Sequence, residues 1–74
     1  MINKDNITTK KFGKKVKLER VKRDLSQEQL AELSDLSRPS IGAIERAESS
    51  PSIETAASIA KALDIELYKL FIFE

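Results

Sequence analysis

Two helix-start signals lie close together near the middle of the 74-residue chain, and they constrain its fold more than any other feature. The stretch LSQEQL (residues 25–30) sets Ser26 three residues before Gln29, which is the pattern of a capping box inside a hydrophobic staple. We expect a short helix from about Gln27 to Ser34. Ser37 repeats part of the pattern just after it and indicates the start of a second short helix. Two short helices around so tight a turn form a helix-turn-helix.

The remaining periodic segments also indicate helices, because no long stretch alternates apolar and polar residues as a strand would. We expect a first helix over residues 9–24 and a later one that Ser52 caps. The later helix carries the clearest apolar stripe: Ile53, Ala56, Ala57, Ala60 and Leu63. The chain is therefore predicted to be all-α, with residues 1–8 as a flexible N-terminal segment and residues 9–74 as one domain.

The missing residue types exclude several classes of function. The chain has no cysteine and no histidine, so thiol chemistry, Cys/His zinc sites and histidine acid–base catalysis are excluded. No apolar run approaches the roughly 18 residues of a membrane span, and no signal-peptide pattern opens the sequence. We expect a cytoplasmic protein with no metal, no other cofactor and no membrane partner. A domain this small depends on close helix packing or on a partner subunit.

Charge is distributed unevenly along the chain, although the formal net charge is only +1. Residues 1–24 hold nine Lys/Arg against three Asp/Glu, a balance of +6, whereas residues 25–74 hold four against nine, a balance of −5. One basic face or arm of this kind is the usual electrostatic footprint for a polyanion. Charge alone leaves open the alternative that these lysines only keep a surface helix soluble.

A family resemblance rests on residues spread over most of the chain. The segment SQEQLAELSDLSRPSIGAIERAESSPSIETAASIAKALDIELYKLF (residues 26–71) resembles the phage-repressor/Cro-type helix-turn-helix domain, often called the XRE family, and the match extends over about residues 12–71. The positions that carry it are Gln27, Leu30, Ala31, Leu36, Ser37, Ile41, Ile44, Glu45, Arg46, Pro51, Ser52 and the run from Ile59 to Leu63. The resemblance implies a compact five-helix lambda-repressor-like domain with a central helix-turn-helix. It also implies a DNA-binding transcriptional regulator, similar in length and layout to the small controller proteins of restriction–modification systems.

The resemblance further implies which side chains contact DNA. Gln27 corresponds to a residue that holds a phosphate and braces the second, recognition helix, and a helix N-terminus suits a phosphate in any case. The other positions are Ser37, Arg38, Pro39, Ser40 and Ala43 at the major groove, and Arg46, Ser49 and Ser50 at the DNA backbone. Arg38 alone has the reach for a bidentate contact to guanine, worth about 1–3 kcal/mol of discrimination. The small residues either touch thymine methyl groups or are merely tolerated at the surface, and DNA shape then supplies much of the specificity.

Arg20 is out of place by polarity, because it lies on the line of Phe12 and Val16 along the first helix. From the pattern alone, either its head group reaches the edge of the core or a carboxylate meets it there. The resemblance implies the second possibility, since Arg20 and Glu45 correspond to a buried ion pair. It also places the small Ala31 where the paired helices cross most closely.

Four positions depart from the family pattern. Asp35 replaces a turn glycine but tolerates a left-handed backbone, whereas Ala47 replaces another frequent glycine and is strained by about 1 kcal/mol if its φ is positive. Pro39 disfavours helical geometry at Arg38, so we expect the recognition helix to begin a residue late with Arg38 as its cap. Glu66 stands where serine or threonine often caps the last helix.

The end of the chain is more apolar than one small core requires. We expect Leu67, Leu70, Phe71 and Phe73 to form a dimer interface on the last helix, although core packing is the alternative for the first three. Family members commonly dimerise through this helix, which sets two recognition helices about 34 Å apart, one turn of DNA. A symmetric homodimer implies a pseudo-palindromic operator.

The leading hypothesis is therefore a sequence-specific regulator that binds double-stranded DNA as a homodimer, controller-like or autoregulatory. The alternative is an antitoxin-like chain that mainly binds a partner protein, whose signature is a long disordered extension, and the extensions here are short. An enzyme has almost no support, since no pair of carboxylates or lysines has a spacing that suggests a shared cleft. RNA binding lacks an aromatic platform in the basic segment, and no small-molecule ligand is expected.

Overall fold

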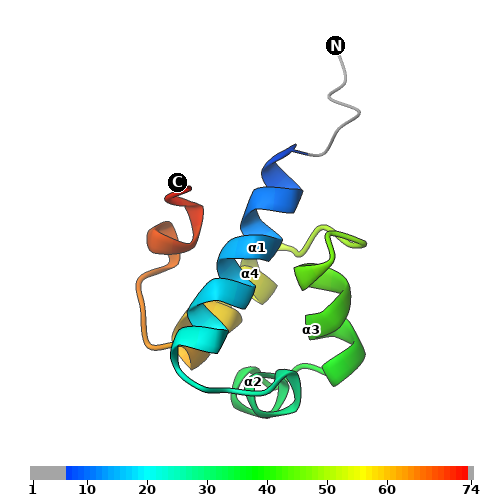
Figure 1. The fold of residues 1–74 in the computed structure, drawn as a ribbon, viewed down its shortest axis with the longest axis vertical. Helices are drawn as coiled ribbons and strands as arrows, with labels where there is room; N and C mark the ends of the chain where they lie inside the picture. Colours follow the sequence, from blue (N-terminus) through cyan, green and yellow to red (C-terminus); the bar gives the residue numbers. More distant parts are fainter. Residues whose placement is uncertain (1–6, 74) are drawn as a thin grey trace.

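The computed structural model describes residues 7–73, and within this range it is all-helical, as the sequence predicts. Its elements are α1 (Ile7–Lys22), α2 (Gln27–Ser34), α3 (Arg38–Glu45), α4 (Ile53–Ala62) and a short 3-10 helix, η1 (Leu67–Phe71). In the view of Figure 1, α1 lies in front of α4, α2 closes one end of the molecule, and α3 and the C-terminal segment flank α1 on opposite sides. None of these helices is long and apolar enough to cross a membrane.

Serine side chains begin three of the helices, as the cap pattern predicts. Ser26 Oγ accepts the N–H of Gln29 at 3.0 Å while Gln29 Oε1 accepts the N–H of Ser26 at 2.8 Å, so the capping box is complete. Ser37 and Ser52 cap α3 and α4 by accepting the N–H three residues further on. Each cap satisfies a backbone N–H that a helix start leaves without an intrahelical partner. Because these signals are local, α2 has the bounds expected from the sequence.

The start of α3 corrects one expectation. Arg38 is already helical and Ser37 is the cap, with Ser37 Oγ accepting the N–H of Ser40 at 3.1 Å. The helix therefore does not begin a residue late, and Arg38 is not its cap. Pro39 falls in the first turn, where the missing N–H of proline would have had no intrahelical partner. The serine cap outweighs the bias that proline places on the preceding residue.

The first helix also differs from its expected bounds. α1 begins at Ile7, two residues before the expected start at residue 9, and ends at Lys22, two residues before the expected end at residue 24. Residues 7 and 8 are therefore helical. The rest of the predicted flexible segment, residues 1–6, lies outside the described residues.

The fifth helix is the short 3-10 element η1 and not an α-helix. Glu66 stands at its N-cap position and makes no side-chain hydrogen bond there, and Ile72 is already extended after it. Its five residues are close to the short length at which 3-10 helices occur. The predicted fold class holds: within residues 7–73 the five predicted helices are four α-helices and this 3-10 helix.

The hydrophobic core takes one face from every element. Its buried members are Phe12, Val16, Leu30, Ala31, Ile41, Ile44, Ala56, Ile59, Ala60, Leu63 and Leu70. The stripe expected on α4 is wrong at two positions, because Ile53 is 76 % exposed and Ala57 is exposed as well. The buried stripe follows the helical spacing i, i+3, i+4 and i+7: Ala56, Ile59, Ala60 and Leu63.

Each of the four α-helices ends with one residue in the left-handed conformation. These residues have φ between 57° and 61°: Asp24, Asp35, Ala47 and Asp64. In each case the following residue donates its N–H to a carbonyl five positions back, for example Glu48 to Ala43 at 2.8 Å, which forms a Schellman motif. Aspartate tolerates this conformation better than most L residues, so the turn at Asp35 survives without glycine. Alanine has no such tolerance, and Ala47 is strained, as the missing glycine predicts.

Replacing Ala47 with glycine is expected to stabilise the protein by about 1 kcal/mol, because glycine adopts a positive φ without steric cost. Urea unfolding followed by circular dichroism measures the change. Ala57→Gly is the matched control: Ala57 is exposed within α4, where glycine costs about 0.5–1 kcal/mol. Equal destabilisation by both substitutions would mean that Ala47 carries no strain.

Candidate nucleic-acid interface

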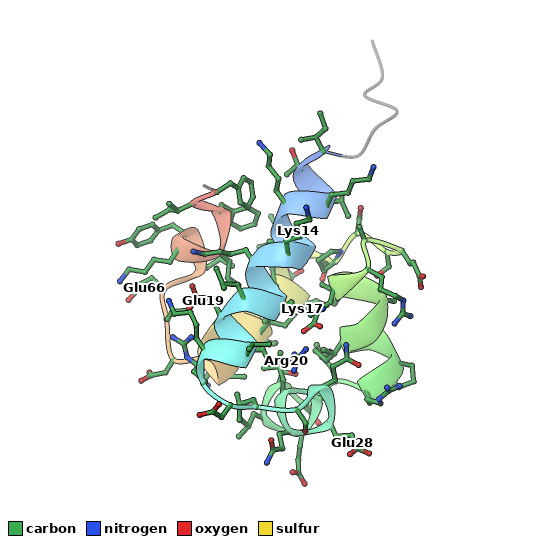
Figure 2. All side chains as sticks on the ribbon, viewed as in Figure 1. Lys14, Lys17, Glu19, Arg20, Glu28 and Glu66 are labelled. Carbon is green, nitrogen blue, oxygen red and sulfur yellow. The ribbon has the colours of Figure 1, made fainter. Side chains whose placement is uncertain are left out.

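A buried ion pair joins the end of α1 to the end of α3. Arg20 Nε lies 2.7 Å from Glu45 Oε2 and Arg20 Nη2 lies 3.0 Å from Glu45 Oε1, so the contact is bidentate. The two side chains are only 11 % and 2 % exposed, and Arg20 Nη1 also donates to the carbonyl of Leu25 at 2.7 Å. Figure 2 shows Arg20 near the end of α1 that lies closest to α2. Of the two possibilities for this arginine, the structure has the one in which a carboxylate meets it.

Gln27 connects this ion pair to the start of α2. Its Nε2 donates to Glu45 Oε1 at 3.0 Å, so one carboxylate accepts hydrogen bonds from both α1 and α2. Within residues 7–73, no buried side-chain nitrogen or oxygen lacks a hydrogen-bond partner. A fully satisfied buried network of this kind makes the elements that it joins rigid. It holds α3 at a set angle to α1 and α2.

The exposed side of α3 carries mostly short side chains. Ser37, Pro39 and Ser40 are exposed, and Ala43 is half-buried beside them. Ser37 Oγ donates to Ser40 Oγ at 2.8 Å, so these two hydroxyl groups bond to each other. Arg38 is the one long side chain of this group, and it is exposed too. The first turn of α3 therefore offers a shallow surface with a single cationic side chain.

Arg46, directly after α3, is already engaged by a neighbouring carboxylate. Its Nε and Nη2 each lie 3.0 Å from an oxygen of Glu48, and both side chains are 57 % exposed. The hydrogen bonds from Arg46 lower the pKa of Glu48, and the same bonds raise the pKa of Arg46. A phosphate that approached Arg46 would compete with Glu48. Glu48 is not among the residues expected from the sequence, although an acid two positions after an arginine that is predicted to contact the DNA backbone is a signal that could have found it.

The loop after α3 lies against the first turns of α1. Ser49 and Ser50 are exposed in this loop, and Ser50 Oγ is 3.2 Å from Thr9 Oγ1. One turn further along α1, Gly13 packs directly on the end of α3, where a Cβ at Gly13 would lie 2.4 Å from the carbonyl oxygen of Ile44. Only a residue without a side chain allows this approach. The contact is not among those expected from the sequence, because it joins residues far apart in the chain.

A second charged cluster lies on the opposite side of α1 and connects helices. Glu19 is buried and pairs with Lys15 at 3.2 Å, Lys22 at 3.6 Å and Arg23 at 2.7 Å. The hydrogen bond from Arg23 is the main cause that lowers the pKa of Glu19, against the desolvation that raises it. Arg23 also donates to the carbonyl of Leu63 at 2.8 Å, which ties α1 to the end of α4.

Nowhere in residues 7–73 do three or more potential metal-binding side chains gather.

The predicted dimer residues divide between the core and the surface. Leu70 is wholly buried in the core, so its place in the predicted interface is wrong, because it has no surface to offer a partner. Phe71 is 46 % exposed, and its ring packs on Phe12 with the ring centroids 5.1 Å apart. Leu67 and Phe73 are half-buried against the core.

Known proteins share both the sequence pattern and this fold. The sequence model of the helix-turn-helix family HTH_3 matches residues 16–70. The control protein C.SmaI of Serratia marcescens is 49 % identical over 47 residues, which are 64 % of this chain and little more than half, 56 %, of that protein. The uncharacterized HTH-type transcriptional regulator MJ0272 of Methanocaldococcus jannaschii is 38 % identical over 60 residues, 81 % of this chain and 91 % of its own length. The crystal structure of the restriction-modification controller protein C.AhdI from Aeromonas hydrophila superposes with a TM-score of 0.84 at 41 % identity, over 85 % of this chain and 96 % of that one.

Two short helices joined by a left-handed turn, with the first turn of the second helix exposed, define a helix-turn-helix domain. The buried ion pair and its glutamine hold this second helix in place. The chain belongs to the HTH_3 family of XRE-type helix-turn-helix proteins. This is a family of DNA-binding transcriptional regulators and not of enzymes.

Proposed function

We propose that this protein is a sequence-specific transcriptional regulator that binds a pseudo-palindromic operator as a homodimer, in the manner of a restriction–modification controller. The observation that carries the proposal is the buried network of Arg20, Glu45 and Gln27, which holds α3 with its first turn exposed. The similarity to the control protein C.SmaI and to the controller protein C.AhdI supports the controller-like role. A regulator of this kind acts in the cytoplasm, where its DNA lies.

Direct recognition of bases would depend mainly on Arg38. It is the one cation in the first turn of α3, and a guanidinium bonds guanine O6 and N7 in a bidentate way. Ser37, Pro39, Ser40 and Ala43 let α3 lie close to the base edges, where their carbon atoms touch thymine methyl groups. With so few direct contacts, the shape and bending of the operator supply part of the specificity.

Phosphates on either side of the groove would meet the ends of the two helices. Gln27 lies in the first turn of α2, where free N–H groups and the helix dipole favour an anion. Arg46 and Ser49 lie after the end of α3, at the edge of the surface that faces the groove. Arg46 exchanges Glu48 for a phosphate at little cost, because their ion pair is exposed to water.

The homodimer would use the apolar surface at the C-terminal end. Leu67, Phe71 and Phe73 lie there partly exposed, and Tyr68 and Ile72 are 61 % and 47 % exposed beside them. A concentration of large apolar groups on so small a surface marks an interaction site. In the dimer the two α3 helices lie roughly 34 Å apart, so that each reads one half of the operator.

The proposal is tested by a mobility-shift assay on the DNA directly upstream of the protein's own gene, with random duplex of equal length as competitor. Light scattering measures the molar mass at the same concentration. We expect binding to the upstream fragment in excess of competitor at physiological salt, and a mass twice the 8.3 kDa of one chain. Equal binding to upstream and random DNA would contradict sequence specificity, and a monomer mass would contradict the homodimer.

Replacing Arg38 with alanine is expected to remove about 1–3 kcal/mol of discrimination at one base position in each half-site. Binding to a set of operator fragments, each with one base pair changed, measures this. Lys61→Ala removes an exposed cation from α4 and should leave the preference unchanged. A uniform loss of affinity on every fragment would assign Arg38 to a phosphate instead.

A further inference from the structure

The helix-turn-helix itself is negatively charged, which is unexpected for a surface that binds a polyanion. Residues 25–50 hold two arginines against five Asp/Glu, a balance of −3. One of those arginines, Arg46, is bound to the carboxylate of Glu48. The electrostatic attraction that brings a protein to DNA must therefore come from another part of the chain. The excess of positive charge lies on α1.

The six lysines of α1 form two rows along the helix. Residues three or four apart share a face, which separates an α3-side row from a C-terminal-side row: Lys10, Lys14 and Lys17 in the first, and Lys11, Lys15 and Lys22 in the second. Figure 2 shows Lys14 and Lys17 on the side of α1 turned toward α3, and Glu19 on the opposite side.

Every lysine of the C-terminal-side row has a partner within the protein. Lys15 and Lys22 pair with Glu19 at 3.2 Å and 3.6 Å. The ammonium of Lys11 lies 6.0 Å from the ring centroid of Phe73, at the limit of a cation–π contact. Lys15 and Lys22 are therefore paired within α1, and Lys11 approaches the C-terminal segment.

The α3-side row is arranged differently. Its three lysines are exposed, and the ion pairs formed within residues 7–73 include none of them. Lys10 and Lys14 line a hollow together with Arg46 at the end of α3, and Lys11 of the other row borders the same hollow. The contact between Thr9 and Ser50 joins the same part of α1 to the loop after α3. The row therefore continues the surface of Arg46 and Ser50 onto α1.

We propose that Lys10, Lys14 and Lys17 bind backbone phosphates of duplex DNA, beside the segment that α3 reads. The inference rests on the proposed function and adds to it a second contact surface, on α1 and outside the helix-turn-helix. Ammonium groups bind phosphates as point charges and carry no sequence information. The row therefore raises the affinity for every duplex and adds to the salt dependence, to which the helix-turn-helix contributes little because its net charge is negative.

The test compares two double variants that remove the same charge from the same helix. Lys10→Gln/Lys14→Gln acts on the α3-side row. Lys15→Gln/Lys22→Gln acts on the other row, away from the hollow beside Arg46, and leaves Arg23 paired with Glu19. Fluorescence anisotropy gives the Kd of each variant between about 50 and 200 mM salt, on the upstream fragment and on random duplex. Circular dichroism confirms that both variants are folded.

For the first variant we expect the slope of log Kd against log salt to fall by about 0.9 for each lost phosphate contact, equally on both duplexes. For the second we expect the wild-type slope. Equal slopes for the two variants would overturn the inference, and the proposed function would stand if the wild type still prefers the upstream fragment. A wild type that binds both duplexes equally, with the slope difference present, would overturn sequence specificity alone. A wild type that binds neither duplex would overturn both.

Discussion

Replacing Glu45 with alanine is expected to lower the free energy of unfolding by about 3–5 kcal/mol. The carboxylate is 2 % exposed, and its removal leaves the guanidinium of Arg20 buried without its counter-charge and the amide of Gln27 without its acceptor. A domain of this length has a total of only about 4–11 kcal/mol. The variant should therefore lose much of its stability, which urea unfolding followed by circular dichroism measures.

Two further variants separate the effect of burial from the effect of charge. Glu48→Ala breaks an ion pair of the same bidentate geometry that is 57 % exposed, and it should change stability very little, because water and salt screen exposed pairs. Arg20→Met/Glu45→Leu removes both buried charges together and is expected to recover most of the stability. A loss for Glu45→Ala no larger than that for Glu48→Ala would contradict the role of burial.

The double variant also separates folding from DNA binding. It should fold, yet Gln27 no longer has the acceptor that holds its amide, and α3 is no longer tied to α1 by hydrogen bonds. We therefore expect weaker binding to the operator from a protein that retains most of the wild-type stability. The buried network then acts on DNA binding through the angle of α3 and not through stability.

The serine caps of α2, α3 and α4 could be predicted from the sequence because each depends on residues three positions apart, although Pro39 led to an expected start of α3 one residue too late. Ser26 with Gln29, and Ser37 with Ser40, form their caps through contacts that need no distant partner. The left-handed turn at Asp35 is local in the same sense, since it depends on the tolerance of one aspartate. Interactions between near neighbours in the sequence do not depend on the packing of distant residues, so the predicted bounds of α2 are correct.

Contacts between distant residues could not be predicted in this way. Arg20 and Glu45 are 25 positions apart, and only the family resemblance, not the spacing, paired them. Ile53 fits the apolar stripe of α4 by type, but the packing of the other helices decides how α4 rotates, and it leaves Ile53 in water. Leu70 shows the same limit, because an apolar side chain does not reveal whether its own core or a partner covers it.

Replacing Gly13 with alanine is the second substitution with a large expected effect, and its sign is opposite to that expected from helix propensity. In an isolated helix alanine is more favourable than glycine by about 1 kcal/mol. In the folded protein the new Cβ would lie 2.4 Å from the carbonyl oxygen of Ile44 and 2.9 Å from that of Glu45, so α1 and α3 must move apart. Overpacking typically costs about 1–3 kcal/mol, and this contact is with backbone, which yields least. We therefore expect a net loss of stability in urea unfolding.

Gly42→Ala is the matched control. Gly42 lies in α3 and faces a side chain, whereas Gly13 faces backbone atoms. Its Cβ would lie 2.9 Å from the guanidinium of Arg46, the far end of an exposed and flexible side chain that can turn away. Gly42→Ala is therefore expected to stabilise the protein by about 0.5–1 kcal/mol. The same sign for both substitutions would contradict a close backbone contact between α1 and α3. Opposite signs would mean that this contact fixes the position of the end of α3 against α1. Because α3 is the proposed recognition helix, Gly13→Ala should then also weaken operator binding per folded molecule.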